Sequence, residues 1–528
     1  MLRAALAIGL CGTAAAPASA ANLCVAERGG CYRSIQKAVD AARDGDSIRV
    51  GPGVHAGGVT IDKNVQLRGA GASATRIRGG GPVLTLGTPF APDPPTIAIS
   101  GVTISDGVTS SAILDGVPVT HMAFGGGVLI PSSQDRAPGA AVTITDSVIE
   151  RNVAAPSATV PSPSNRQCPG GPCPYAGGYG GGIYNAGSLT LTRTTVAANR
   201  NGTRPGAAPL ASDAEGGGIF SIGPLTLIDS QVVDNESRTL PPNARYANGG
   251  GVFSQSGGVT LQRSTISGNR AILESSWPAS VEQHTVGGGL FVGGDSPATI
   301  ERSRIEDNAL TAFNTVGDAI AFSGGLQGNG PVIMRDSIVG SNHVTASVPP
   351  GSTGMASADS GAGNLNVAST IAGSRLVANT ATAVAGAGSA IAGAGALWAW
   401  SDDTIDVRGS VISGNQVSAI GRGTVAARGG GIVNVDALAL RATDVSQNTV
   451  RAIGRSGEAL GGGIFNGRVP DSQDFTPQFS AADSEITGNA IAAGPGIVAH
   501  GGGLFTSEPI TLDRTRIRGN RPDQCAGC

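Results

Sequence analysis

One short stretch of the sequence combines the residue types that polysaccharide chemistry needs. It reads GALWAWSDDTIDVRG and covers residues 395–409. Its candidate catalytic residues are Asp402, Asp403, Asp406 and Arg408. Paired carboxylates hydrolyse glycosidic bonds, whereas a lyase needs a base and an acidic cluster that holds calcium. The stretch therefore has the composition of such a site, and calcium would be its cofactor only in a lyase.

The same stretch has a structural interpretation, in which its carboxylates belong to an irregular turn. The five histidines are scattered along the chain, and no lysine follows Lys63, so other bases are scarce. We favour the turn over catalysis and predict no cofactor and no metal site.

Aromatic side chains offer a second kind of function, because their rings form platforms for sugar rings. The candidate glycan-binding residues are Trp398, Trp400, Tyr184, Phe220, Phe253 and Phe291. The last four recur at one place of a repeat, and Phe465 and Phe505 occupy the same place. Strict alternation along a strand would make them an outward stripe. A corner that broke the alternation would stack them inside the fold, and we expect this interior stack.

The repeat is clearest in residues 180–200, GGGIYNAGSLTLTRTTVAANR, and residues 216–236, GGGIFSIGPLTLIDSQVVDNE. Three glycines and an aliphatic residue begin at Gly125, Gly180, Gly216, Gly249, Gly287, Gly429, Gly461 and Gly501. Weaker copies begin at Ser323, Gly361 and Gly393. An asparagine three residues after an aliphatic one closes each copy, at Asn152, Asn199, Asn235, Asn269, Asn308, Asn342, Asn379, Asn415, Asn448, Asn489 and Asn520. Starts and ends alternate strictly, which predicts a stacked repeat.

Within each copy the apolar residues alternate with polar ones, as in Leu189, Thr190 and Leu191. Period two with β-branched residues indicates strands, and we expect three in each copy. No copy can bury its apolar face alone, so the copies must stack about 4.8 Å apart. The prediction is an all-β protein, a single right-handed parallel β-helix solenoid of eleven coils with a short N-terminal capping helix.

The two motifs then have structural roles. Stacked corners leave little room for a Cβ atom and often need positive φ, which favours glycine. Asparagine tolerates such corners and can hydrogen-bond to its copy in the next coil. We therefore expect the eleven asparagines to form a ladder.

The paired glycine and asparagine motifs resemble the repeats of polymorphic outer-membrane proteins. Residues 33–80, from RSIQKAVDAARDGDSIRV to RIRGG, are similar to the start of secreted right-handed β-helix proteins of the pectin-lyase-like class. This resemblance implies a fold but no single activity, because the class includes lyases, glycosidases, adhesins and passenger domains. The chain has no G-H-G, N-T-D or R-x-K arrangement of the pectin-degrading enzymes. It also has no C-terminal translocator barrel, which disfavours an autotransporter role.

Four segments are expected along the chain. Residues 1–20 read as a secretory signal peptide, and residues 21–46 as a disulfide loop followed by the capping helix. Residues 47–520 form the parallel β-helix, and residues 521–528 a disulfide tail. In the helix, Ser34 is a suitable cap, and the residues that share one face are Ile35, Val39 and Ala42.

Six cysteines remain after the signal peptide, and they lie in three near pairs. The pairs are Cys24 with Cys31, Cys168 with Cys173, and Cys525 with Cys528. Local disulfides are expected for all three in an oxidising compartment. The rival interpretation is a metal site at the last pair, but no second pair of ligands completes it.

The segments between each asparagine and the next glycine run are longer than a corner needs. They are rich in Ala, Ser, Pro, Gly and Thr, so we expect loops that stack on one side of the rod. Two similar inserts inside the copies, PSSQDRAP and PDSQDFTP, carry Asp135 and Asp474. A repeated partner contact is one interpretation of these aspartates, and plain loop carboxylates the other.

The net charge of −3, without a basic cluster, predicts no nucleic-acid partner. No segment after the signal is apolar over the length that a membrane span needs. We predict a secreted or cell-surface rod, non-catalytic, that binds a surface polysaccharide or a protein through its loop-rich side. The alternative is a polysaccharide lyase or glycoside hydrolase that acts on acidic glycans.

Overall fold

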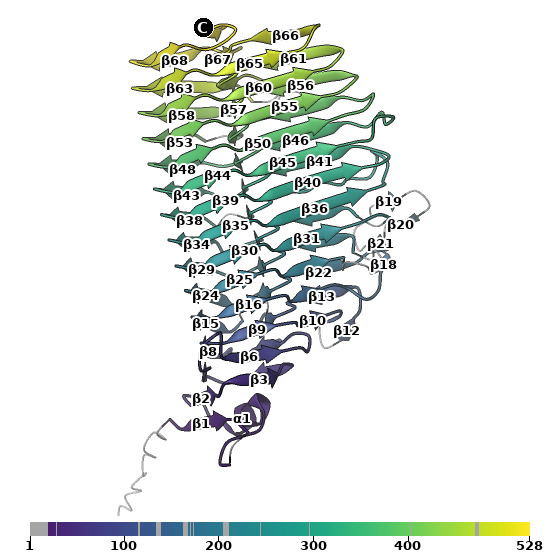
Figure 1. The fold of residues 1–528 in the computed structure, drawn as a ribbon, viewed down its shortest axis with the longest axis vertical. Coiled ribbons are helices and arrows are strands. Elements are labelled where there is room, and N and C mark those ends of the chain that lie inside the picture. The colour runs from purple at the N-terminus through teal and green to yellow at the C-terminus, as the bar shows by residue number, and fades with distance from the viewer. Residues whose placement is uncertain are drawn as a thin grey trace, which may run out of the picture.

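The computed structural model describes residues 20–27, 29–114, 117–133, 139–161, 167–168, 171–172, 174–203, 211–242, 244–294, 296–401, 403–469 and 475–528. The fold is a right-handed parallel β-helix that rises from a capping helix at the N-terminal end (Figure 1). Every strand of the long sheets pairs in parallel with its copies in the coils below and above.

Three long sheets, A, B and C, form the body of the rod. Sheet A has 15 strands, and sheets B and C have 14 each. Sheet A runs from β1 (Asn22–Val25) to β68 (Ile510–Asp513), sheet B from β3 (Gly53–Ala56) to β69 (Arg516–Arg518), and sheet C from β4 (Val59–Ile61) to β70 (Cys525–Ala526). The N-terminal segment therefore adds rungs before the first recognisable copy, and the rod is longer than the eleven expected coils.

One coil shows the path of the chain through all the sheets. Its strands are β38 (Ala298–Glu301) in sheet A, β39 (Arg304–Glu306) in sheet B, β40 (Ala309–Asn314) in sheet D, β41 (Ala319–Ser323) in sheet I and β42 (Leu326–Gly328) in sheet C. A coil here has five strands, so the expectation of three was wrong. The two additional strands lie between the asparagine and the glycine run, in the segments that we expected to be loops.

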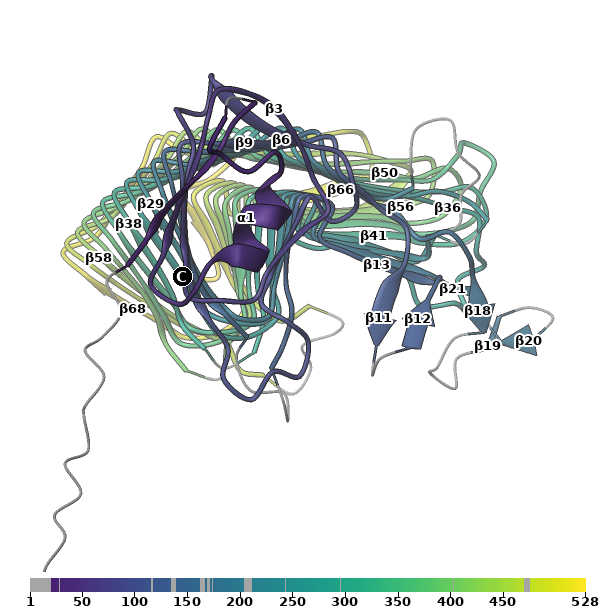
Figure 2. The same ribbon diagram turned by 90° about the horizontal axis from the view of Figure 1, so that it is seen from below.

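These additional strands form a fin that projects from one side of the body (Figure 2). Sheet D has 11 strands, from β10 (Val108–Thr109) to β65 (Ala490–Ala493). Two shorter sheets lie opposite it. Sheet F consists of β13 (Met122–Phe124), β22 (Gly177–Tyr179), β27 (Asp213–Glu215) and β32 (Tyr246–Asn248). Sheet I consists of β41, β46 (Ala356–Ser360), β51 (Ala390–Gly393), β56 (Thr424–Arg428), β61 (Ser456–Leu460) and β66 (Ile497–His500).

The fin has its own apolar core, which is separate from the core of the body. Sheet D contributes Ala271, Ala312, Ala346, Ala383, Ala419 and Ala452. Sheet I contributes Ala319, Ala358, Ala392, Ala427 and Ala459. Such small side chains let the two sheets pack closely, while Thr and Ser alternate with them on the outer faces.

The asparagines at the B–D corner form one continuous ladder inside the rod. The Nδ2 atom of each donates to Oδ1 of the next along the chain, at 2.9–3.0 Å. Each Oδ1 except the first also accepts the backbone N–H of the preceding asparagine. The ladder therefore pairs polar groups that would otherwise be buried without partners.

The glycine corner depends most on the middle residue of each triplet. This residue is glycine in all eleven copies, at Gly126, Gly181, Gly217, Gly250, Gly288, Gly324, Gly361, Gly395, Gly430, Gly462 and Gly502. The strand register corrects the start of two weaker copies from Gly361 to Ser360 and from Gly393 to Ala394. The outer two positions accept Ser or Ala there, whereas a Cβ on the middle residue would meet a carbonyl of the next coil.

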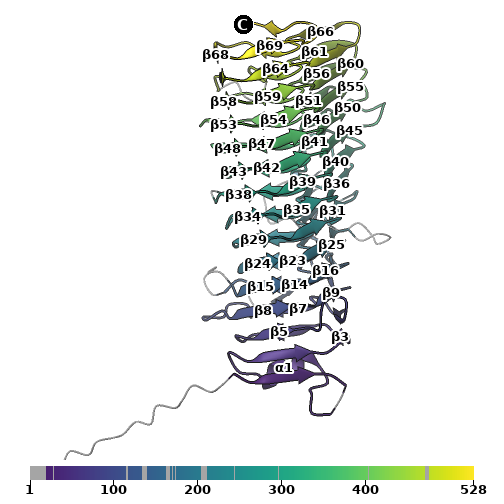
Figure 3. The ribbon, with the colours of Figure 1, turned by 60° about the vertical axis from the view of Figure 1, so that its left-hand side comes forward.

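The N-terminal end is closed as predicted. Helix α1 (Ile35–Ala41) lies across the first coil (Figure 3), and Ser34 Oγ accepts the backbone N–H of Lys37. Ile35 and Val39 are buried against the body core. Cys24 and Cys31 form the predicted disulfide beside this cap.

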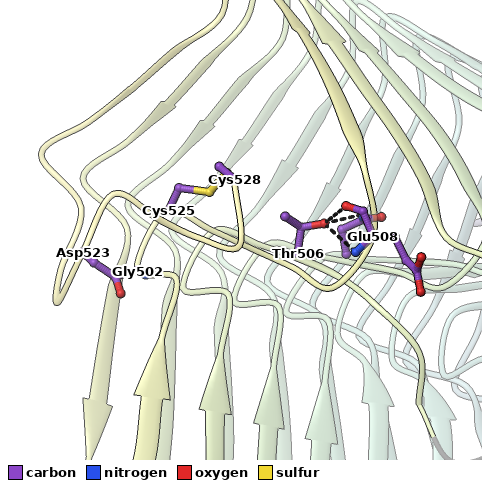
Figure 4. Close-up of a disulfide and its surroundings, with 7 residues drawn as sticks. Gly502, Thr506, Glu508, Asp523, Cys525 and Cys528 are labelled. Atoms are coloured by element: carbon purple, nitrogen blue, oxygen red, sulfur yellow. Dashed lines mark hydrogen bonds between the residues drawn. A yellow bond between two sulfur atoms is a disulfide. The ribbon is translucent and has the colours of Figure 1, made fainter.

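At the other end, the tail adds a last short strand. Strand β70 pairs with β67 (Leu504–Thr506), and Cys525 is joined to Cys528 by a disulfide (Figure 4). The carboxylate of Asp523 accepts the N–H of Gly502 at 2.7 Å, which holds the tail on the last coil. Cys173 of the predicted Cys168–Cys173 pair lies outside the described residues, as do Asp135 and Asp474 of the two inserts.

Within the described residues, no helix has both the length and the apolar character that crossing a membrane would require.

Candidate functional site

The fin and the body meet at an angle that runs along the rod, here called the groove, and buried side chains fill it over part of its length. One wall is the outer face of sheet C, and the other is the face of sheets F and I that turns away from the fin core. The chain enters the groove twice in each coil, once just before the glycine run and once just after it, as at Phe322 and Gln327. Two columns of side chains therefore face each other across the angle between the sheets.

The sheet C column carries the aromatic residues that the repeat pattern had marked. Tyr184, Phe220, Phe253 and Phe291 are in register on adjacent strands. These strands are β23 (Ile183–Asn185), β28 (Ile219–Ser221), β33 (Val252–Ser254) and β37 (Leu290–Val292). The ring centroids of successive members lie 5.3, 5.4 and 4.3 Å apart, with nearly parallel planes.

These rings form a stack, but the stack lies outside the body core, whereas we expected it inside. Ile219 and Phe220 point to opposite faces of the strand, and Ile219 packs in the body core. Phe220 packs instead against Tyr179 of the fin, at 5.2 Å between centroids. The sequence pattern was compatible with both arrangements because it gave no sign of the fin that covers the rings.

The aromatic column is interrupted for two coils. In register after Phe291 come Gln327 and Asn364, and then Trp398 restores the aromatic character. A pocket of about 580 Å³ opens in the groove at this interruption. Phe291 borders it on one side, and Trp400 and Phe475 border it on the other.

A network of amide groups forms the floor of the pocket. Asn329 Oδ1 accepts hydrogen bonds from Gln327 Nε2 and from Asn366 Nδ2, both at 2.9 Å. Gln327 and Asn364 are only 4% and 5% exposed. Even so, Gln327 Oε1 and Asn364 Oδ1 find no hydrogen-bond partner in the described part of the chain. Buried carbonyl oxygens of this kind favour a ligand that donates hydrogen bonds.

The fin supplies the opposite wall of the pocket, with His284, Phe322 and Asp359. Asp359 accepts a hydrogen bond from Ser357 Oγ at 3.1 Å. The rings of His284 and Phe322 meet edge to face, with 5.7 Å between centroids. The pocket thus combines aromatic walls, amide groups and one carboxylate.

The structure places the candidate site residues of segment 395–409 in different surroundings. Trp400 lines the pocket, whereas Trp398 is 5% exposed and packs against Phe465 and Val433. Asp406 lies on β53 (Ile405–Arg408) of sheet A and not in the groove. On sheet A it pairs with Arg408 at 3.2 Å and with Arg441 at 3.7 Å. Asp403 is exposed, and Asp402 lies outside the described residues. Trp400 therefore does not share a site with Asp403 or Asp406.

Sequence reasoning missed Gln327, Asn364 and Asp359. A signal for the first two exists, because they interrupt the aromatic position in the two weaker copies SGGL and GAGN. No such signal exists for Asp359, since its side of the groove is the fin.

A second polar cluster lies further along the groove toward the N-terminus. The hydroxyl groups of Tyr175 and Tyr179 are 2.5 Å apart, and Asn248 Nδ2 donates to Glu215 Oε1 at 3.4 Å. Burial, followed by the nearby charge of Asp213, raises the pKa of Glu215 to about 8. Burial also raises the pKa of Tyr175 to about 12. Glu215 is therefore protonated at neutral pH beside a second carboxyl group.

We expect Glu215 to make stability fall as the pH rises. Its pKa in the folded protein is about 8 against an ordinary 4.5, so only the folded chain keeps this proton between those pH values. Glu215→Gln removes the titration, and the variant should exceed the wild type at pH 8 by on the order of 2–3 kcal/mol. At about pH 4, below both pKa values, the Glu215 side chain is mostly uncharged in the folded and the unfolded chain, and the two proteins should nearly match. Thermal unfolding from about pH 4 to pH 8 measures this difference, and parallel curves would contradict it.

Among the described residues, no group of three or more His, Cys, Asp or Glu side chains is arranged to hold a metal ion.

Comparisons with protein-family models and with curated protein sequences found no match. Among solved structures, a PL6 alginate lyase in complex with a trisaccharide aligns over 94% of this chain and 88% of its own, with 11% identity and a TM-score of 0.27. The A-module of the Azotobacter vinelandii mannuronan C-5 epimerase AlgE6 aligns over 93% of this chain and 94% of its own, with 14% identity and a TM-score of 0.20. At these TM-scores, neither similarity bears on the chemistry of the groove.

Proposed function

We propose that the protein is a secreted rod that binds a polysaccharide through the pocket between body and fin. The observation that carries the proposal is the pocket at Gln327 and Asn364, where buried, unpaired carbonyl oxygens lie between aromatic walls. Sugar rings have apolar faces that stack on aromatic rings and hydroxyl groups that donate hydrogen bonds. Beyond the pocket, Phe220 and Trp398 are buried, so the proposed contacts are with the sugar units that enter the pocket.

The binding side in this proposal differs from the one expected from the sequence. The segments that we expected to be recognition loops are mostly strands of the fin, and their apolar side chains are buried in its core. What remains for recognition is the inner face of the fin together with sheet C. Secretion fits the disulfide between Cys24 and Cys31, since such bonds persist in oxidising compartments.

A second candidate function is cleavage of the bound chain by hydrolysis. Glu215, protonated near neutral pH, and Asp213 follow each other on the same face of β27. Glycosidases use two carboxyl groups whose surroundings separate their pKa values. This observation supports a proton donor in the groove, whereas binding needs no such group.

Trp400→Ala is expected to weaken polysaccharide binding at least about tenfold, because an aromatic wall of the pocket is lost. Affinity electrophoresis against a polysaccharide panel, followed by calorimetry on the best ligand, measures the change. The matched control is Trp277→Ala, since Trp277 packs on Val281 of the fin and does not line the pocket. Equal affinities of the two variants would contradict the proposal. Chain shortening by the wild type but not by Glu215→Gln would establish the second candidate.

A further inference from the structure

The pocket that interrupts the aromatic column contains two buried acceptor atoms without partners. The orientation of the Gln327 amide follows from its network, because Asn329 Oδ1 already accepts from Gln327 Nε2 and Asn366 Nδ2. Turning the amide of Gln327 over would set oxygen against oxygen, so Oε1 is the atom left without a partner. The second unpaired acceptor is Asn364 Oδ1.

The charged groups of the pocket also favour a ligand that donates hydrogen bonds over an anionic one. Asp359 is a carboxylate on the fin wall, and neither Arg nor Lys occurs among the described residues that line the pocket. Arg428 lies two coils beyond Asp359 in the same column of the fin. Its guanidinium group is already paired with Glu458 and lies over the ring of Phe465, at 5.7 Å from the centroid. A bound carboxylate would therefore meet acceptors and a like charge, with no Arg or Lys side chain among the described lining residues to pair with it.

From these observations we infer that the sugar unit in this pocket carries no negative charge and is held through its hydroxyl or acetamide N–H donors, not through a uronate carboxylate. The inference rests on the proposed polysaccharide binding and names its substrate class. Hydroxyl groups and amide N–H groups can donate to Gln327 Oε1 and Asn364 Oδ1, and they carry no charge that the Asp359 carboxylate would repel. Burying a carboxylate unpaired beside these groups would be strongly unfavourable.

The size of the interruption fits a sugar ring. Three rung spacings of about 4.8 Å separate the strands of Phe291 and Trp398, about 14 Å in all. The pocket occupies the space that two more aromatic rings in the column would fill, and amide side chains form its floor. A ring that enters between Phe291 and Trp400 thus contacts aromatic faces at its sides and acceptors below.

The test uses polymers of one backbone that differ only at C6. We would compare β-1,4-mannan with β-1,4-mannuronan oligosaccharides, and β-1,4-glucan with β-1,4-glucuronan oligosaccharides, by calorimetry. The uncharged member of the best-binding pair should bind about tenfold more tightly or better, and Asn364→Ala should weaken it about fivefold to tenfold.

Asp359→Asn provides a second measurement that does not depend on loss of binding. This nearly isosteric change removes the charge, so the preference for the uncharged member should narrow by about fivefold to tenfold while that member still binds. Asp62→Asn, at an exposed site near the capped end, is the control.

Each outcome decides between the two proposals. If a uronate polymer binds as tightly as its uncharged partner, the inference about the sugar is wrong, although polysaccharide binding stands. If no polymer of any pair binds, both are wrong. An unchanged preference in Asp359→Asn would overturn the role given to that carboxylate.

Discussion

Asn308→Ala lowers the free energy of unfolding by about 3–5 kcal/mol, the largest expected effect of a single side chain in this protein. Asn308 is fully buried in the middle of the asparagine ladder. Its Oδ1 accepts the backbone N–H of Asn269 at 3.1 Å and the Nδ2 group of Asn269 at 2.9 Å. Its Nδ2 donates to Ile266 O and to Asn342 Oδ1, both at 3.0 Å.

The reason for the size of the effect is that alanine removes the acceptor but leaves the donors. Two N–H groups of Asn269 and the carbonyl of Ile266 would remain buried, and each unpaired group costs about 1–3 kcal/mol. The body and fin leave no path by which bulk water could replace the lost amide, because its neighbours in the ladder are buried as well.

Chemical denaturation of the purified chain measures the change in unfolding free energy, and hydrogen exchange locates it. The control is Gln231→Ala, which removes an amide from an exposed position of sheet B and should change stability by less than about 0.5 kcal/mol. Faster exchange should centre on the coils of Asn269 and Asn342. A stability loss no larger than that of the control would show that the ladder is not a source of stability.

The body of the fold could be predicted because its sequence signals are strong. Leu, Ile and Val alternate with Thr in sheet A, as at Leu225 and Leu227, so the period of two is unmistakable. The glycine triplets and the asparagines mark two corners, since only these residues suit a crowded turn and a buried ladder.

The fin could not be predicted, because most of the apolar residues in its core are alanine. A strand such as β50 (Thr380–Val384) reads TATAV, and alternation between Ala and Thr has little contrast in hydrophobicity. Such a segment resembles a flexible loop until a partner sheet with equally small side chains is known to face it. Since half of the groove belongs to the fin, Asp359 and His284 could not be assigned to a site from the sequence.

Part of the groove was visible nevertheless. The aromatic repeat correctly marked one column of side chains in the groove. The interruption of this column at Gln327 and Asn364 can also be read from the sequence. Asp406 is close in sequence to Trp400 but does not share its site, because the chain passes from β52 (Leu397–Ala399) of sheet C to β53 of sheet A between them. In a coil, residues a few positions apart can face different sides, while residues one full turn apart share a site.

Gly361→Ala and Gly363→Ala, two positions apart, are expected to change stability in opposite directions. Gly361 is a middle glycine of the corner, and a Cβ there would lie 2.3 Å from Gly395 O and 2.7 Å from Thr380 N. Neither backbone atom can rotate away, so the coils would have to separate. We expect a loss of about 3 kcal/mol, which is typical of overpacking in a rigid surrounding.

Gly363 lies instead on β47 (Gly363–Leu365), where the strands on both sides carry Leu326 and Leu397 at the same register. Its Cβ would meet Leu326 O at 3.5 Å, an ordinary contact, beside a small cavity of about 10 Å³. Alanine there fills space and restricts the unfolded chain, which should stabilise the protein by about 0.5–1 kcal/mol. Thermal unfolding of the two variants beside the wild type checks both signs. If both substitutions were tolerated alike, the corner glycines would owe their presence to something other than the contact between coils, and close stacking of the rungs could not be the reason why the middle position is glycine in every copy.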